Sequence, residues 1–235
     1  MLPSPTAHVP MRAEGLLMSV VRIKSFDRAA IEANHHIANN LAPIVGLIRR
    51  QTGKRPQESV LPAEEVRGSL QDFSLRVDAV GRLHRLLARG NELLTTVDLP
   101  TYLREIADAA ICSLASEKQT EILLDLEPER PMSARQATAV GLVIGEAITN
   151  ALKYSHPTGV PGKIGIVTRR NTDCGLIIEV ADDGVGLPEG FDPYATKSTG
   201  MALMRELAEQ LSARLEFEQP PIGLCVRLEL PPPLP

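Results

Sequence analysis

Residues 141–156 read GLVIGEAITNALKYSH, the pattern of a helix with one apolar side and one polar side. At about 100° per residue the apolar side chains gather on one side; they are Val140, Ile144, Ala147, Ile148 and Ala151. Glu146, Asn150 and Lys153 gather on the opposite side, within roughly 60° of one another. Such a face is most often solvated. The alternative is a site for a metal-bound polyphosphate, because amide and carboxylate oxygens suit Mg²⁺ and an ammonium neutralises phosphate.

Two glycine motifs follow this helix. Residues 176–190, LIIEVADDGVGLPEG, run from an apolar strand pattern into Asp182, Gly184 and Gly186. An Asp-Gly turn explains this motif by itself, whereas a dinucleotide-binding turn needs a helix at the glycines, and LPEGFDP is not one. The second motif, STGM at 198–201, opens a helix whose first amides can face phosphate. The ordered set of three motifs is more specific than any one of them.

This ordered set resembles the ATPase domain shared by histidine kinases, gyrase-type topoisomerases and the Hsp90 chaperones. EAITNALKYSHP is similar to the N-box of that domain, DDGVGLP to its first glycine box and STGMALM to its second. The resemblance covers about residues 98–231, which we expect to form an ATP-binding catalytic domain. It implies an α/β sandwich with a mixed sheet, and ATP and Mg²⁺ as its ligands.

The resemblance also implies roles for individual residues. Asn150 is expected to bind Mg²⁺, with Glu146 beside it as a further metal ligand and catalytic group. Lys153 and His156 are expected to face the phosphates. Asp182 is expected to accept a hydrogen bond from the adenine amino group, and three glycines to let the backbone approach the nucleotide: Gly184, Gly186 and Gly200. Thr199 stands where the family more often has Leu or Gly.

The periodicity of the remaining segments predicts an α+β layer, a sheet with helices on one face. Helices are predicted at about 100–116, 134–154 and 200–212. Strands are predicted at EILLDLE, KIGIVTRR, GLIIEVADD, RLEFEQ and GLCVRLELP, which begin at residues 121, 163, 175, 214 and 223.

Two amphipathic helices precede this domain. In the first, at about 24–51, four apolar residues recur at 4-3-4 spacing: Ile37, Leu41, Ile44 and Ile48. The second begins near Pro62, and its stripe is Val66, Leu70, Phe73, Val77, Val80, His84 and Leu87. A single hairpin leaves part of both stripes exposed, so we expect residues 23–97 to form a four-helix bundle as a homodimer. Residues 1–22 and 232–235 are predicted to be tails.

The first of these helices contains EANHHIANNL at residues 32–41. His35 points away from the apolar stripe and shares its face with Glu32 and Asn39. Exposed histidines are mostly ordinary surface residues, but a carboxylate or amide that holds one ring nitrogen leaves the other free to attack a phosphate. The segment resembles the phosphoacceptor box of the bacterial sensor histidine kinases whose motif is His-Arg-x-x-Asn-Asn-Leu, relatives of the HWE group. The resemblance implies that His35 is the acceptor, with His36 at the usual Arg.

Composition excludes several classes of function. A net charge of −4, no Trp and four Phe argue against nucleic-acid binding. The three cysteines are odd in number and lie in apolar segments, which predicts buried thiols in a reducing, cytoplasmic compartment and no disulfide or zinc framework. The apolar run GLLMSVV is too short to span a bilayer, so no membrane insertion is expected.

These observations together predict a two-component signalling histidine kinase. It would autophosphorylate His35 with ATP and pass the phosphoryl group to an aspartate of a response-regulator receiver domain. A histidine phosphotransfer or scaffold protein without kinase activity, and an anti-sigma-type protein-serine kinase, remain alternatives. Residues 1–22 are too short for a sensor domain, so the signal is expected from a separate sensor protein, the tail or a region outside this sequence.

Overall fold

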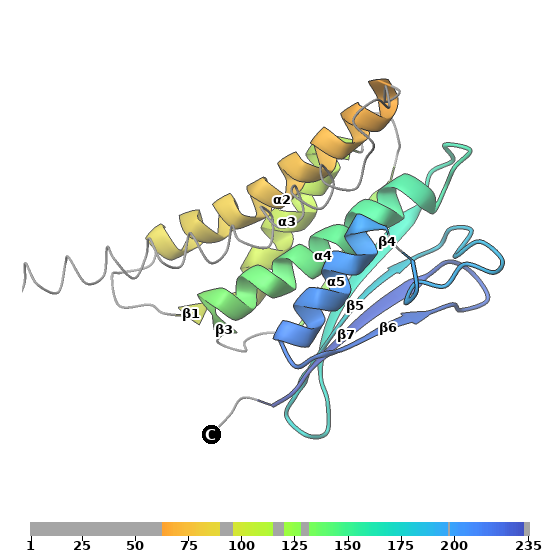
Figure 1. The fold of residues 1–235 in the computed structure, drawn as a ribbon. Helices are drawn as coiled ribbons and strands as arrows, with labels where there is room; N and C mark the ends of the chain where they lie inside the picture. Colours follow the sequence, from red (N-terminus) through yellow and green to blue (C-terminus); the bar gives the residue numbers. More distant parts are fainter. Residues whose placement is uncertain (1–62, 90–95, 115–119, 128–131, 197, 233–235) are drawn as a thin grey trace, which may run out of the picture. The chain divides into compact units, whose positions relative to one another are not determined.

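The computed structural model describes residues 63–89, 96–114, 120–127, 132–196 and 198–232 (Figure 1). All of these residues belong to one unit of the chain, residues 40–235. The first helix of the predicted hairpin lies outside the described residues, and so do Glu32, His35 and Asn39. Their roles and the domain division at residues 97/98 stay predictions.

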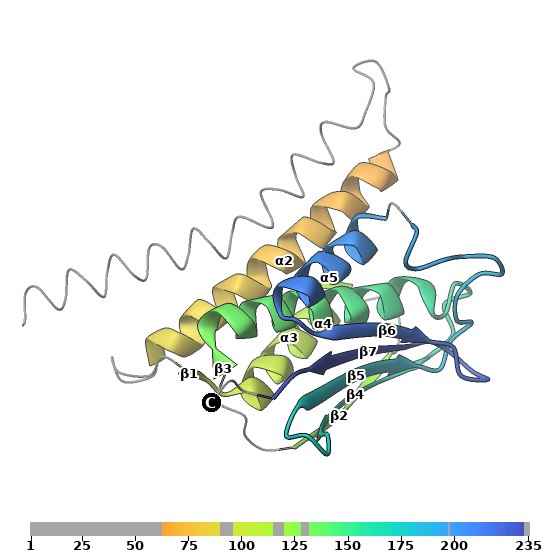
Figure 2. The ribbon, with the colours of Figure 1, turned by 60° about the horizontal axis from the view of Figure 1, so that its bottom comes forward.

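A five-stranded mixed sheet forms one layer of the described part (Figure 2). Its strands, in spatial order, are β2 (Glu121–Leu126), β4 (Lys163–Arg170), β5 (Leu176–Asp182), β7 (Cys225–Leu230) and β6 (Arg214–Glu218). β2 and β4 are parallel, because a helix connects them, and the other neighbours are antiparallel. A separate two-residue ladder joins β1 (Thr96–Val97) to β3 (Met132–Ser133). The predicted strands and the α+β class are confirmed; β1 and β3 are too short for the pattern to show.

Three helices cover one face of the sheet, and a fourth packs against two of them, on the side away from the sheet (Figures 1 and 2). The covering helices are α3 (Leu99–Leu114), α4 (Ala134–Tyr154) and α5 (Thr199–Gln210), and the fourth is α2 (Ala63–Arg89). α4 matches its predicted bounds, and its predicted apolar face is buried. Ser133 begins α4 with a capping box, in which its hydroxyl accepts from the Gln136 amide at 3.3 Å.

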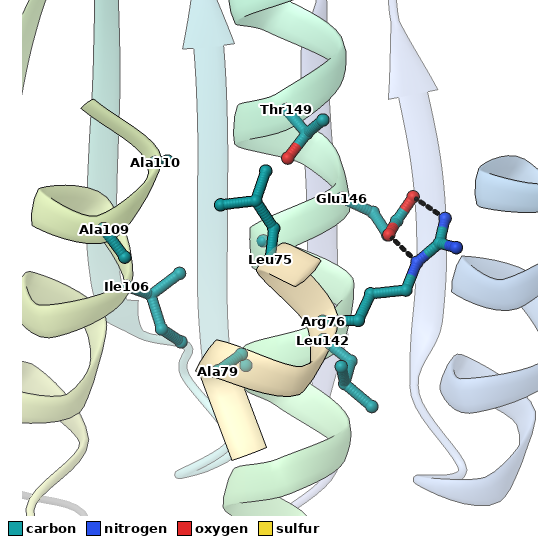
Figure 3. A pocket seen from close by; sticks show the side chains of 11 residues that line it. Leu75, Arg76, Ala79, Ile106, Ala109, Ala110, Leu142, Glu146 and Thr149 are labelled. Carbon is teal, nitrogen blue, oxygen red and sulfur yellow. Dashed lines mark hydrogen bonds and ion pairs between the residues drawn. The ribbon is translucent and has the colours of Figure 1, made fainter. Parts of the chain in front are cut away.

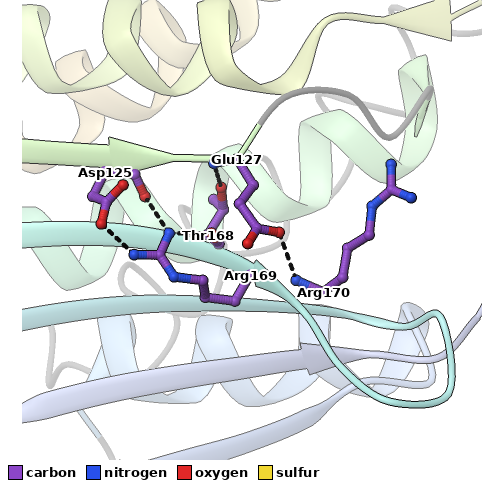
Figure 4. A network of polar contacts seen from close by, with 5 residues as sticks. All are labelled: Asp125, Glu127, Thr168, Arg169 and Arg170. Carbon is purple, nitrogen blue, oxygen red and sulfur yellow. Dashed lines mark hydrogen bonds and ion pairs between the residues drawn. The ribbon is translucent and has the colours of Figure 1, made fainter.

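At the edge of the sheet, polar contacts continue the pairing of β2 and β4 past the strand end (Figure 4). The Glu127 amide donates to Thr168 Oγ1 at 2.8 Å, and Glu127 Oε2 accepts from the Arg170 amide at 3.0 Å. Arg169 pairs with Asp125 on the neighbouring strand. The parallel pair therefore keeps its backbone donors satisfied where its ladder stops.

Helix α2 joins the same core as α3 and α4. Its inner side buries Ala79, Val80 and Leu83, and the hydroxyl of Tyr102 on α3 donates to the Ala79 carbonyl at 3.1 Å. The predicted stripe of α2 is only partly packed here, because Leu70 is 63% exposed and Val77 39% exposed. The side chains at the other stripe positions 66, 84 and 87 lie outside the described residues.

The prediction of buried cysteines was wrong for two of the three. Cys112 and Cys174 are exposed, and Cys225 is half-buried. Cys112 lies near the end of amphipathic α3, and Cys174 lies in a turn with a φ of 61°. An apolar sequence neighbourhood does not fix burial at the end of an element, because the chain leaves the core there.

Two glycines of α4 give opposite expectations for the same substitution. A Cβ at Gly141 would lie 2.5 and 2.6 Å from Cε1 and Cζ of Tyr102, whereas at Gly145 the nearest atom, Cγ2 of Ile106, would be 3.8 Å away. Gly→Ala in a helix is worth about 1 kcal/mol of stability by propensity alone. We therefore expect Gly145→Ala to raise the free energy of unfolding and Gly141→Ala to lower it by about 1–3 kcal/mol through overpacking.

Thermal and urea unfolding of the two variants measures this difference. Equal stabilisation by both would show that Tyr102 moves freely, which its buried ring and its hydrogen bond to α2 argue against.

Candidate functional site

A cavity of about 400 Å³ opens where the carboxyl-terminal half of α4 meets the ends of β5 and β7. Its volume is in the range of small-molecule sites. Its wall is mostly apolar, with Val180, Leu187, Phe191, Met201, Leu224 and Val226 among its lining residues. Four polar residues interrupt that wall: Asn150, Ser155, Asp182 and Ser198. An apolar cleft with a few polar groups suits a flat heterocycle that needs orientation.

Asp182 supplies an acidic group to this cavity. It ends β5, and its Oδ1 accepts from the Gly184 amide at 2.9 Å. Burial raises the pKa of Asp182, although the amides of Gly184 and Leu224 and the charge of His156 act in the opposite direction. The backbone of Gly223 crosses directly over Asp182 with a φ of 81°, where a side chain would collide with the Asp182 carbonyl. The glycine turns thus fix where this carboxylate stands.

Asn150 is the member of the predicted polar triad that lines the cavity. The other two members contact α2, which the sequence did not lead us to expect. Glu146 is buried and forms an ion pair with Arg76 (Figure 3), and Lys153 pairs with Asp72. The structure therefore places the three residues on one face of α4, as predicted, but two of them have protein partners.

Arg76 and Asp72 were missed in the sequence. Their only sequence signal is an acid and a base one helical turn apart on a predicted helix, which is common on solvated surfaces. Arg76 also falls between positions of an apolar stripe, where a periodicity analysis does not look for a functional side chain.

His156, Gly184 and Gly200 make protein contacts beside the cavity. His156 lies 3.4 Å from Asp183, measured from Nε2 to Oδ1, and its Nδ1 is 2.8 Å from Ser155 Oγ. Gly184 lies against the backbone of Ser155, and a Cβ at Gly200 would lie 2.5 Å from Glu146 Oε2. In this structure both glycines allow close packing of protein segments, and the predicted phosphate contact of His156 stays a prediction.

Phe191 and Ser198 line the cavity, and residues 193–196, which follow Phe191 closely, are held on two sides. The Arg205 guanidinium on α5 donates to the carbonyls of Pro193 and Thr196, the latter at 2.9 Å. On the other side the Tyr194 ring meets Phe217 edge to face, with centroids 5.4 Å apart. These contacts hold residues 193–196 beside the cavity, and no motif in the sequence pointed to them.

The donor set near the cavity fits a nucleotide-bound Mg²⁺ better than a metal cage. Among the residues that the structure describes, there is no group of three or more His, Cys, Asp or Glu side chains that could hold a metal ion. Mg²⁺ usually binds one or two protein oxygens together with water and substrate phosphates. The Asn150 amide oxygen meets that requirement, whereas the Glu146 carboxylate is engaged by Arg76 in this structure.

Two family profiles match the chain. Residues 135–234 match the family described as histidine kinase-, DNA gyrase B- and HSP90-like ATPase. Residues 32–114 match a family described as histidine kinase. The fold around the cavity is therefore that of this class of ATPase domains. The two profiles together extend from residue 32 to residue 234, and the chain belongs to the histidine kinases.

Individual relatives agree with this assignment. Blue-light-activated histidine kinase 2 of Erythrobacter litoralis is 26% identical over 89% of this chain and 59% of its own length. The sensor histidine kinase PdtaS of Mycobacterium tuberculosis is 27% identical over 86% of this chain and 39% of its own. The solved histidine kinase domain of the E. litoralis blue-light-activated kinase has a TM-score of 0.66 at 25% identity, covering 89% of this chain and 94% of that one.

The chain thus spans about three-fifths or less of these two curated relatives. No helix within the described ranges is long and apolar enough to cross a membrane.

Asp182→Asn tests the role of the cavity acid in nucleotide binding. The amide oxygen of Asn can still accept from the Gly184 amide, so we expect the turn to survive. The N–H group of Asn would instead face the adenine amino group, so that two hydrogen-bond donors meet and neither has an acceptor. This costs about 1–3 kcal/mol, or roughly 5–150-fold in ATP affinity. Calorimetric titration with ATP, alongside thermal unfolding to show that the fold is kept, measures the loss; unchanged affinity would contradict the assignment.

Proposed function

We propose that the chain is an ATP-dependent protein-histidine kinase that phosphorylates itself at His35 and passes the phosphoryl group to a response-regulator aspartate. The cavity carries this proposal: it combines an apolar wall, the half-buried Asp182 and the Asn150 amide at one end of α4. Asp182 would accept from the adenine amino group, and Asn150 would face the metal-bound phosphates. Gly186, with a φ of 70°, would let the backbone pass close to the nucleotide.

The proposed first step transfers a phosphoryl group from an oxygen of ATP to a ring nitrogen of His35. One ring nitrogen of His35 uses its lone pair to attack the γ-phosphorus of ATP. The bond from that phosphorus to the bridging oxygen breaks, and ADP leaves with the electron pair. The proton on the other ring nitrogen passes to a neighbouring carboxylate such as Glu32, or to water, with Asn39 holding the ring. Mg²⁺ would neutralise charge on the phosphate oxygens.

The second transfer regenerates the histidine. A carboxylate oxygen of the receiver-domain aspartate attacks the phosphorus, the N–P bond breaks, and the imidazole recovers its lone pair and then a proton. The proposal thus names a receiver domain as protein partner and ATP as phosphoryl donor, and it places the catalytic part in the cytoplasm. Any sensor input would come from a separate protein, from residues 1–22 or from a region outside this sequence.

His35→Gln and His36→Gln distinguish the acceptor from its neighbour. We expect His35→Gln to abolish incorporation of phosphate from γ-labelled ATP while nucleotide binding remains, because the ATPase part is untouched. His36→Gln should keep at least part of the activity. The labelled wild type should lose its phosphate in acid and keep it in base. Acid-stable label would support the serine-kinase alternative instead, and the reverse pattern of the two variants would move the acceptor to His36.

We also propose a homodimer through the hairpin. Leu70 and Val77 lie two turns apart on one side of α2 and are exposed in the single chain, so they are available to a second copy. Val77→Asp should place an unpaired charge in that interface and cost several kcal/mol of assembly. Light scattering should then report monomer, with autophosphorylation reduced and ATP binding kept.

Leu123→Asp is the matched control, because Leu123 is also an exposed apolar residue, at 48%, but lies on β2. It should leave the oligomeric state unchanged. A wild type that is monomeric at micromolar concentration and still phosphorylates itself would contradict the dimer.

A further inference from the structure

Helix α2 contacts the charged residues on the polar face of α4 through two ion pairs, in one of which α2 supplies the cation and in the other the anion. Arg76 Nε donates to Glu146 Oε1 at 2.5 Å, and its Nη2 donates to Oε2 at 2.9 Å. Both side chains are only 7% exposed. One turn earlier on α2, Asp72 accepts from Lys153. α2 therefore places a cation at Glu146 and an anion at Lys153.

We propose that this contact is an autoinhibitory clamp, in which Arg76 occupies the place of the nucleotide-bound divalent cation and Asp72 that of a phosphate. The inference rests on the proposed function, which assigns Glu146 to Mg²⁺ and Lys153 to phosphate. Docked α2 and the Mg²⁺-phosphate part of ATP then exclude each other on α4. The kinase binds ATP in its reactive arrangement only when α2 has moved away.

Electrostatics makes the two occupants incompatible. A carboxylate held by both nitrogens of a guanidinium has its charge compensated, and a divalent cation brought to it would be repelled by Arg76 at close range. An arginine guanidinium is always charged in a protein. Arg76 therefore stays a cation, and the competition cannot be relieved by its losing a proton.

A purely structural role explains these ion pairs less well. A buried ion pair contributes little net stability compared with apolar side chains of similar size, and Ala79, Val80 and Leu83 already join α2 to the core. The contact is also imperfectly filled, since a cavity of about 20 Å³ remains between α2, α3 and α4 beside Arg76 and Glu146 (Figure 3). That is room for about one water molecule.

Exchange of occupants would leave no buried charge without a partner. When α2 departs, Mg²⁺ compensates Glu146 in place of the guanidinium, and a phosphate compensates Lys153 in place of Asp72. Asn150 lies between Glu146 and Lys153 along α4, and it also lines the cavity that contains Asp182. The face of α4 that α2 contacts is therefore next to the proposed adenine end of the site. Affinity for the Mg²⁺-nucleotide and release of α2 are then reciprocally coupled.

Two variants and two ligands test the clamp in the full-length chain. The non-hydrolysable analogue AMP-PNP with Mg²⁺ reaches the phosphate end, whereas adenosine reaches only the Asp182 end. We expect Asp72→Asn and Arg76→Gln to bind Mg²⁺–AMP-PNP about tenfold more tightly than wild type if about nine-tenths of the wild type is clamped. Adenosine affinity should not change. Asp78→Asn and Arg85→Gln, which alter exposed residues of the same helix, should match wild type for both ligands.

Hydrogen exchange supplies a readout that does not depend on activity. In the wild type, Mg²⁺–AMP-PNP should raise amide exchange across residues 70–86, and adenosine should not. Arg76→Gln leaves Glu146 buried without its partner; if that variant unfolds, Asp72→Asn decides, because the Asp72–Lys153 pair is 28% and 21% exposed and its loss is milder.

The outcomes separate the clamp from the proposed function. Equal Mg²⁺–AMP-PNP affinities for Asp72→Asn and wild type, or α2 exchange that Mg²⁺–AMP-PNP leaves unchanged, overturn the clamp while nucleotide binding stands. Failure of wild type and Asp72→Asn alike to bind either ligand overturns the proposed function, and the clamp with it.

Discussion

Helix α4 has to satisfy two environments at once, and the rest of the described structure depends on how it does so. Its apolar side belongs to the core between the helices and the sheet, and it is buried almost without interruption from Ala137 to Leu152. Its opposite side carries an acid, an amide and an amine into a region that α2 and α5 also enter. Because a buried charge without a partner is costly, these elements must supply partners or stand aside for a ligand that does.

The close approach of neighbours to α4 follows from this constraint. Gly141 lets the Tyr102 ring reach the helix backbone, and the Tyr102 hydroxyl in turn holds the Ala79 carbonyl of α2. Gly200 allows the start of α5 to approach Glu146. Replacing either glycine would push an element away from α4 and change the position of the charged face, so packing and site chemistry are not independent in this protein.

The cavity itself depends on backbone geometry more than on charge. Asp182 is held where it is by the Gly184 amide and by Gly223, which crosses over it. Near Phe191, which also lines the cavity, residues 194–196 are held by the Arg205 guanidinium and by the ring contact of Tyr194 with Phe217. A site built in this way suits a flat apolar group that carries a hydrogen-bond donor.

The sequence by itself determined the main helices and strands of the ATPase domain and the protein family to which its cavity belongs. Apolar periodicity placed α4 and β4 at their observed ends, because helix and strand periods are local properties of the chain. The three motifs also placed Asn150, Asp182 and Gly186 at one cavity. The tertiary structure alone decided that Glu146 meets Arg76, that Lys153 meets Asp72, and that Cys112 and Cys174 face solvent. The physical reason is that a helix pattern tells which residues share a face, whereas the partner of that face depends on how segments distant in the chain pack together.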